Sequence, residues 1–315
     1  MIVTVTMNPA VDRTVRIESL HRGGLNRIQK AESDAGGKGI NVSKTLKVLG
    51  ADSTATGFLA GTAGKKIEEQ LKIQGIQTDF LWIEGETRTN TKVQEIGGCV
   101  TEFNEPGPEV SEEDRNKLLE KLEGYAGENV LFVLAGSLPK GVPDGFYGEI
   151  IRRVHRKGAK VLLDADGERF RSGCEAGPEI VKPNKEELLE YAGIARSVSM
   201  TKEEESQIIE KTVRDLFEKG VKRIVVSMGK EGALMRERGF AAAAEAIPVE
   251  VQSTVGAGDA FAAALAYAWE NKLDKKEAFQ LGMAVSAGAV TTEGTRPPSL
   301  KKVQELLKSL KRAKQ

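Results

Sequence analysis

The residues with the clearest chemical potential are two glycines and a carboxylate, Gly256, Gly258 and Asp259, in the run S-T-V-G-A-G-D. If a helix begins at Gly256, its first backbone N–H groups are free and carry a partial positive charge, which suits a phosphate. The Asp259 carboxylate would repel a phosphate, but it could take a proton from a hydroxyl group that attacks one. Together these groups could perform phosphoryl transfer. An ordinary strand-to-helix turn with an acidic residue in its first turn remains the alternative.

A second glycine cluster, D-A-G-G-K-G-I-N, covers residues 34–41. It is not a P-loop, because Lys38 is followed by Gly39 rather than by Ser or Thr. Its glycines, Gly37 among them, let the backbone approach a ligand, while Lys38 adds a positive charge and Asn41 both donates and accepts hydrogen bonds. The pattern indicates either a contact with a polyol or sugar phosphate, or a turn that caps a helix from residue 40.

Further polar residues follow segments that we expect to be strands. Asp12 comes after the first strand and Ser137 after the most apolar one, and ligands of open α/β sheets bind at the carboxyl ends of the strands. Three cations, Arg27, Lys38 and Arg88, could converge on one phosphate, although each could equally be a solvated surface charge.

A third group would suit a nucleotide. Asn184 and Glu187 form either a helix capping box or a pair that faces Mg²⁺ and nucleotide phosphates. The segment with Ser227, Gly229 and Gly232 follows another strand and could approach the nucleotide.

The elements that must position these residues alternate between strand and helix. Apolar strand-like runs occupy residues 2–6, 130–134, 160–163, 180–182 and 223–227. Helical apolar spacing separates them, which predicts a mostly parallel sheet with helices on both faces. Two β-type segments, 11–33 and 89–104, interrupt this rhythm. We expect them to form a small sheet that covers a cleft or pairs with another subunit, with two surface hairpins as the alternative; residues 1–10, 34–88 and 105–315 would form the large domain.

Composition narrows the class of protein. The 315 residues contain 46 Lys and Arg and 46 Asp and Glu, so no net charge favours nucleic acid or a membrane. Two isolated cysteines, Cys99 and Cys174, fit a reducing compartment, and the amino terminus has no signal-peptide pattern. We therefore expect a cytoplasmic protein.

In chain order, these segments resemble the PfkB (ribokinase-like) family of carbohydrate kinases over nearly the whole chain. The motifs that match are N-P-A-V-D at 8–12, G-G-K-G-I-N-V at 36–42, G-S-L-P at 136–139, K-P-N at 182–184 and T-V-G-A-G-D at 254–259. The resemblance implies a three-layer α/β/α fold with a mostly parallel central sheet and a small β-sheet lid, which often forms the dimer contact in this family. It also implies ATP, Mg²⁺ and, in some members, a monovalent cation, here near segments 253–255 and 292–296.

The resemblance further implies a role for each candidate residue. Asp259 would be the general base, and the backbone amides of Gly256, Ala257, Gly258 and Asp259 would stabilise the transferring phosphoryl group. The sugar phosphate would contact Asp12, Arg27, Gly37, Lys38, Asn41, Arg88 and Ser137. The nucleotide would contact Asn184, Ser227, Gly229, Gly232, Gly256 and Gly258, with Glu187 serving the metal.

Within the family, segments 87–92 and 101–104 are most similar to the bacterial branch that phosphorylates the C6 hydroxyl of fructose 1-phosphate, giving fructose 1,6-bisphosphate. Tagatose-6-phosphate kinases are the nearest alternative. A non-catalytic regulator that senses sugar phosphate belongs to a different class, and an intact Asp259 argues against it. A nicotinamide-dependent dehydrogenase is disfavoured, because no glycine-rich turn follows the first strand.

Overall fold

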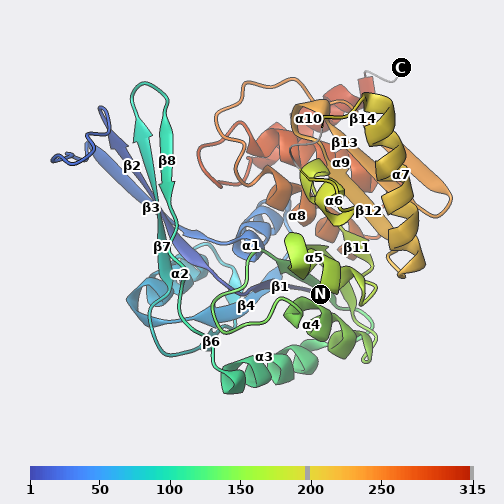
Figure 1. Cartoon of the computed structure of the whole chain (residues 1–315), viewed down its shortest axis with the longest axis horizontal. Coiled ribbons are helices and arrows are strands. Elements are labelled where there is room, and N and C mark those ends of the chain that lie inside the picture. Colours follow the sequence, from blue (N-terminus) through green and yellow to red (C-terminus); the bar gives the residue numbers. More distant parts are fainter. Residues whose placement is uncertain (196–198, 313–315) are drawn as a thin grey trace.

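The computed structural model describes residues 1–195 and 199–312, which form a large α/β body and a small sheet that projects from it (Figure 1). In spatial order, the strands of the main sheet are β14 (Phe240–Ala244), β13 (Ala233–Glu237), β12 (Arg223–Ser227), β11 (Ile180–Val181), β10 (Lys160–Asp164), β9 (Leu131–Ala135), β1 (Ile2–Thr6), β4 (Ser53–Leu59) and β5 (Gln77–Thr78), with β6 (Leu81–Trp82) also paired to β4. In the described structure, the strands from β12 to β5 pair in parallel. At the other edge, β13 runs antiparallel to both of its neighbours, β12 and β14.

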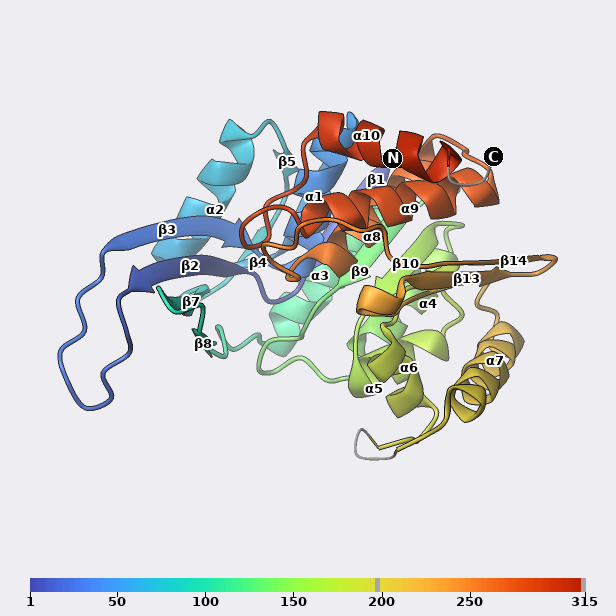
Figure 2. The same cartoon turned by 90° about the horizontal axis from the view of Figure 1, so that it is seen from above.

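Helices cover both faces of this sheet, as Figure 2 shows. One layer contains α1 (Lys38–Leu49), α2 (Gly61–Ile73), α8 (Ala257–Glu270), α9 (Lys275–Ala289) and α10 (Leu300–Arg312). The other contains α3 (Glu112–Tyr125), α4 (Phe146–His155), α5 (Gly167–Cys174), α6 (Lys185–Tyr191) and α7 (Lys202–Glu218). The three-layer α/β/α fold expected from the sequence is confirmed.

Because successive side chains of a strand point to opposite faces, each strand packs against both helix layers. In β9, Leu131 and Val133 pack with α1, α8 and α9, whereas Phe132 and Leu134 pack with the helices of the opposite layer. Every residue of β9 is buried, as expected for a parallel strand covered on both faces. Continuous apolar runs therefore predicted these strands well.

The small sheet consists of β3 (Lys30–Gly36), β2 (Ala10–Ile17), β7 (Arg88–Glu95) and β8 (Val100–Phe103), in that order. It has its own apolar cluster, formed by Val15, Ile17 and Val93. The predicted β segments are therefore real, with one correction. The expected β segment 11–33 is not β throughout: Leu25 and Ile28 lie in the exposed loop between β2 and β3, where no described strand pairs with them.

The parallel strands bring their carboxyl ends to one edge of the main sheet. Thr6, Ser137, Asp164, Asn184 and Ser227 all lie at or just after the ends of such strands, and all of them line one cavity. In the described residues, no helix is both long enough and apolar enough to span a bilayer.

Candidate active site

The cavity lies between the carboxyl edge of the main sheet, the small sheet and the amino end of α8. Its volume is about 1200 Å³, which exceeds the ~300–1,000 Å³ typical of a site for one small ligand. Most of the residues singled out in the sequence line it. They are Asp12, Gly37, Lys38, Asn41, Arg88, Ser137, Asn184, Glu187, Ser227, Gly229, Gly232, Gly256, Ala257, Gly258 and Asp259.

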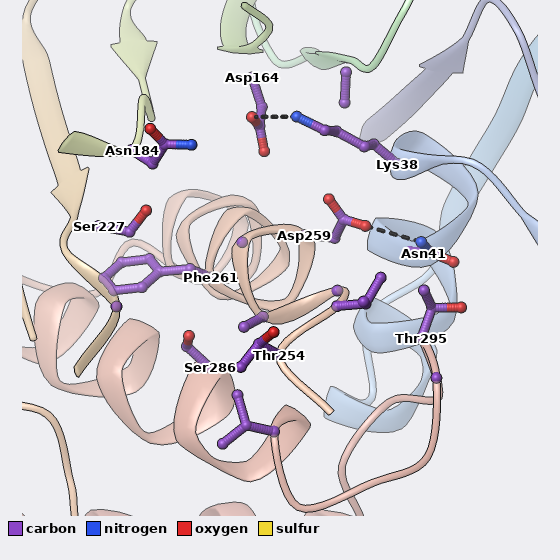
Figure 3. A pocket seen from close by; sticks show the side chains of 18 of the residues that line it. Lys38, Asn41, Asp164, Asn184, Ser227, Thr254, Asp259, Phe261, Ser286 and Thr295 are labelled. Carbon is purple, nitrogen blue, oxygen red and sulfur yellow. Dashed lines mark hydrogen bonds and ion pairs between the residues drawn. The ribbon is translucent and has the colours of Figure 1, made fainter. Parts of the chain in front are cut away.

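Asp259 stands in the first turn of α8, with its carboxylate turned into this cavity (Figure 3). The side chain is only 6% exposed, and its Oδ2 accepts a hydrogen bond of 2.8 Å from Asn41 Nδ2. Burial and the nearby charge of Asp164 raise the pKa of Asp259 to about 6. At neutral pH the carboxylate is ionised, yet it is more basic than an ordinary aspartate, which suits a general base.

The amino end of α8 also offers free donors. The first intrahelical bond runs from Ala260 N to Gly256 O, and in the described structure no protein group accepts from the amides of Ala257, Gly258 and Asp259. Gly256 caps the helix with φ +82°, and a Cβ there would lie 3.3 Å from Cα of Thr295. Only glycine fits this turn without strain, and the turn places a helix end suited to an anion next to the Asp259 carboxylate.

Two lysines and a carboxylate lie beside Asp259. Asp164 is buried, and its two oxygens lie 3.2 Å from Lys38 Nζ and 3.1 Å from Lys182 Nζ. Burial alone would raise the pKa of Asp164, but Lys182 and Lys38 together hold it below its ordinary value. Asp164 in turn raises the pKa of Lys38. The ammonium group of Lys38 therefore stays charged, and both lysines pair with Asp164 near the free amides of α8.

The cavity also contains acceptors without partners. Six buried side-chain polar atoms of the described chain make no hydrogen bond, and all six belong to residues that line this cavity. They are Thr6 Oγ1, Asn8 Oδ1, Asn41 Oδ1, Asn90 Oδ1, Arg88 Nε and Asp164 Oδ2, the last in its ion pair with Lys182. A buried acceptor without a partner costs about 1–3 kcal/mol. A ligand with several O–H donors would satisfy these oxygens.

Asp12 belongs to the small sheet rather than to the carboxyl end of β1, where the sequence placed it. The chain turns directly from β1 into β2, so Asp12 lines the cavity from the small sheet. Its carboxylate accepts a hydrogen bond of 3.2 Å from Asn90. Next to it, Arg88 donates to the carbonyl oxygens of Asn8 at 2.9 Å and Glu105 at 3.2 Å.

The expected convergence of three cations on one phosphate is not seen. Lys38 is paired with Asp164 beside the base, whereas Arg88 lies near Asp12. Arg27 lies in the exposed loop between β2 and β3 and is not among the residues that line the cavity. Sequence alone could not reveal this, because the loop carries Arg27 away from the strands that flank it.

One of the two alternatives that the sequence left open for Asn184 and Glu187, the capping box, is present. They form a capping box, with Asn184 Oδ1 accepting from Glu187 N and Glu187 Oε2 accepting from Asn184 N. Both also line the cavity, and burial raises the pKa of Glu187. In the described residues, no group of three His, Cys, Asp or Glu could hold a metal alone. This donor set fits Mg²⁺, which is usually held by one or two carboxylates together with phosphate oxygens and water.

The cavity that contains the turn at Ser227–Gly232 also has an apolar strip. Ile247, Pro248, Val249, Val251 and Met283 line it. Such a surface would accept a flat base, with the glycine turn at its edge. The sequence did not predict this strip, nor the positions of Asp164, Asn8 and Asn90 in the cavity. The one available signal for Asp164 was its position directly after an apolar strand.

Comparisons with known proteins agree with the fold and with the residues gathered in this cavity. A model described as pfkB family carbohydrate kinase matches residues 3–302, so the chain belongs to the pfkB family of carbohydrate kinases. It is 36% identical over 311 residues to the 1-phosphofructokinase of Bacillus subtilis, covering 99% of both chains. Its identity to the 1-phosphofructokinase of Vibrio cholerae is 35% over 294 residues, covering 93% of this chain and 90% of that protein. The structure of phosphofructokinase-2 from Escherichia coli in complex with potassium matches with a TM-score of 0.91, at 27% identity and 99% coverage of both chains. The resemblance stated from the motifs is confirmed.

Proposed function

We propose that this chain transfers the γ-phosphoryl group of ATP to the C6 hydroxyl of fructose 1-phosphate, giving fructose 1,6-bisphosphate. The observation that carries the proposal is the meeting of Asp259, the free amides of α8 and the unpartnered acceptor oxygens in one cavity. Similarity to two 1-phosphofructokinases along most of the chain supports the choice of sugar.

In this proposal Asp259 takes the proton of the C6 hydroxyl as that oxygen attacks the γ-phosphorus. The amides of residues 256–259 stabilise the charge on the transferring group, and Lys38 and Lys182 add positive charge beside them. Asn41, Asn90 and the carboxylate of Asp12 accept hydrogen bonds from sugar hydroxyls. Gly37 and Ser137 approach the sugar phosphate. Arg88 lies near Asp12 and contacts the same sugar phosphate.

The nucleotide lies along Ser227, Gly229 and Gly232, with its base against the apolar strip. Asn184 and Glu187 would hold Mg²⁺ together with phosphate oxygens of the nucleotide. The ion would supply positive charge to offset the negative charge of the phosphates.

One coupled assay of ADP release tests the proposal over fructose 1-phosphate, tagatose 6-phosphate, fructose 6-phosphate and ribose. We expect the highest kcat/KM with fructose 1-phosphate. A preference for tagatose 6-phosphate would overturn the choice of sugar but not the chemistry. Saturable sugar-phosphate binding without any ADP release would favour the non-catalytic regulator.

We also propose a monovalent cation beside the anion-binding turn, held by carbonyl oxygens of segments 253–255 and 292–296. Gly256, which directly follows the first segment, lies against Thr295 of the second, since a Cβ on Gly256 would lie 3.3 Å from Cα of Thr295. Replacing potassium by tetramethylammonium at constant ionic strength should lower kcat/KM about tenfold, equivalent to about 1.4 kcal/mol of transition-state stabilisation. Equal rates in both salts would contradict this part of the proposal.

A homodimer through the small sheet is the proposed assembly, with residues 11–33 and 89–104 as the lid. Large apolar side chains are exposed on this sheet, including Ile96 at 70% and Phe103 at 55%. Arg27 lies in the same lid, so in a dimer we place it at the interface rather than in its own cavity.

Phe103→Glu should convert the dimer to a monomer in light scattering coupled to size-exclusion chromatography, because it places a charge in an apolar interface. The matched control is Ile73→Glu, which changes an equally apolar and 84% exposed residue on α2. A wild-type protein that elutes as a monomer, or a control that dissociates equally, would argue against this interface.

A further inference from the structure

A buried lysine that the mechanism does not use lies directly behind the sugar-binding side of the cavity. Lys44 is on α1, one turn after Asn41, and is only 6% exposed. It is not among the cavity-lining residues. In the described chain it has no ion pair within 4.0 Å, and its ammonium donates to the carbonyl oxygen of Ala35. A buried cation without a carboxylate partner is costly, so its presence calls for a reason.

The direction of helical side chains explains how Lys44 reaches Ala35. Side chains on a helix lean toward its amino end, so a long stem on the second turn of α1 can reach back past the start of the helix. The atom it meets belongs to the last part of β3, immediately before Gly36. Lys44 therefore ties α1 to the point where the small sheet joins the large body.

The peptide that joins Ala35 to Gly36 also contacts Asp12. In the register of β2 and β3, Val11 lies opposite Ala35 and Asp12 opposite Asp34. The Asp12 carboxylate packs against Gly36 so closely that a Cβ there would lie 2.0 Å from Oδ2. The ammonium of Lys44 and the carboxylate of Asp12 thus both contact the Ala35–Gly36 unit.

Among the cations near Asp12, Lys44 is the one available as a counter-charge. Burial raises the pKa of Asp12, and Asn90, Lys44, Arg88 and Lys92 act against that shift. Lys92 is already paired with Glu102 at 2.9 Å, and two guanidinium nitrogens of Arg88 are bound to backbone carbonyls. The other carboxylate near Lys44 is Asp34, which has its own cation, Arg296, at 3.6 Å.

We propose that Lys44 is a positioning residue for sugar binding: its buried ammonium fixes the Ala35–Gly36 peptide and supplies the counter-charge behind the Asp12 carboxylate. This inference rests on the proposed function, because it assumes that Asp12 holds sugar hydroxyls. Lys44 acts through Asp12 and touches neither the sugar nor the nucleotide.

Three variants separate its charge from its hydrogen bond. Lys44→Met removes both, Lys44→Gln keeps a donor without the charge, and Lys44→Arg keeps the charge. Isothermal titration with fructose 1-phosphate should show that Met and Gln each weaken binding at least about tenfold, whereas Arg stays within about threefold of wild type. The KM for the sugar should rise in parallel, while the KM for ATP and kcat stay within about threefold.

Stability distinguishes positioning from a purely structural role. Met is a good helix former, and it relieves an unpaired buried charge, so Lys44→Met should melt within about 4 °C of wild type. The control is Lys47→Met on the same helix, where the lysine is exposed and paired with Asp52 at 3.0 Å. This variant should bind the sugar normally.

The outcomes are distinguishable. If wild type phosphorylates a sugar phosphate but Lys44→Met binds it as wild type does, the inference fails and the proposed function stands. It also fails if melting temperature and affinity for both substrates fall together, which would indicate a structural role. A wild-type protein that neither binds nor phosphorylates any sugar phosphate overturns both proposals.

Discussion

Asp259→Asn is expected to lower kcat by about 10²–10⁴-fold, the usual contribution of a positioned general base, while ATP and sugar phosphate still bind. Asparagine has nearly the same shape as aspartate, so it keeps the first turn of α8 and the free amides in place. It cannot take the proton of the attacking hydroxyl. Steady-state kinetics and calorimetric titration of each substrate measure the two parts of this prediction.

The same substitution should stabilise the protein at neutral pH. The pKa of Asp259 in the folded protein is about 6, above its ordinary value of 3.8. Because this pKa is raised on folding, the folded state is favoured when Asp259 is protonated. The contribution of Asp259 to the free energy of unfolding is therefore largest below pH 4 and is lost as pH rises through 6. Asparagine carries no charge, so the variant should gain up to about 3 kcal/mol at pH 8.

Asp215→Asn, an exposed position on α7, is the matched control and should change neither turnover nor stability. A near-normal kcat for Asp259→Asn would sink the assignment of the base. Lost turnover together with lost binding of both substrates would instead indicate that the variant has damaged the site.

Asp164→Asn is expected to have the second largest effect. It leaves the ammonium of Lys182, whose side chain is only 4% exposed, buried without a counter-charge. Breaking a buried pair in this way typically costs about 3–5 kcal/mol. The other ammonium, on Lys38, is 36% exposed and can turn toward water, so we expect a loss of about 3 kcal/mol in urea unfolding at pH 7.

This loss should depend on pH with a defined sign. The pKa of Asp164 in the folded protein is held below its ordinary value, chiefly by Lys182. Its contribution to stability is therefore present above pH 4 and disappears as pH falls through the lowered pKa. The difference between wild type and Asp164→Asn should shrink accordingly in acid.

Asp164→Asn should also move the pH profile of the reaction. In the wild type, kcat/KM should fall below about pH 6, where Asp259 becomes protonated. The charge of Asp164 helps to raise that pKa, so its removal leaves Lys38 and Lys182 to lower it, and the acid limb should shift to lower pH. Asp52→Asn, at an exposed residue paired with Lys47, should alter stability by no more than about 0.5 kcal/mol and leave the profile unchanged. An unchanged acid limb in Asp164→Asn would contradict the coupling of the two carboxylates.

Local patterns predicted much of the fold and the centre of the site. The turn at Gly256, the carboxylate at the start of α8 and the buried strands can be predicted from neighbouring residues, because caps, turns and apolar runs are short-range features. Asp164 was missed because its importance depends on Lys38, which is 126 residues away in sequence. Asn8 and Asn90 were missed for the same reason, since their unpartnered oxygens meet only after two sheets have folded.

Loop positions were the least predictable. Leu25 and Ile28 belong to segment 11–33, which we expected to be β throughout, yet no described strand pairs with them, and Arg27 is carried out of the cavity with them. A hydrophobic period predicts a strand only where a partner is available to accept its hydrogen bonds.

The separate apolar cluster of the small sheet has a consequence for substitutions. Val15, Ile17 and Val93 pack apart from the core that supports α8. The outer part of the small sheet therefore has packing of its own, whereas Val11 and Ala35, next to Asp12, pack with the large body. Substitutions in that outer part should leave the position of Asp259 and the free amides of α8 unchanged.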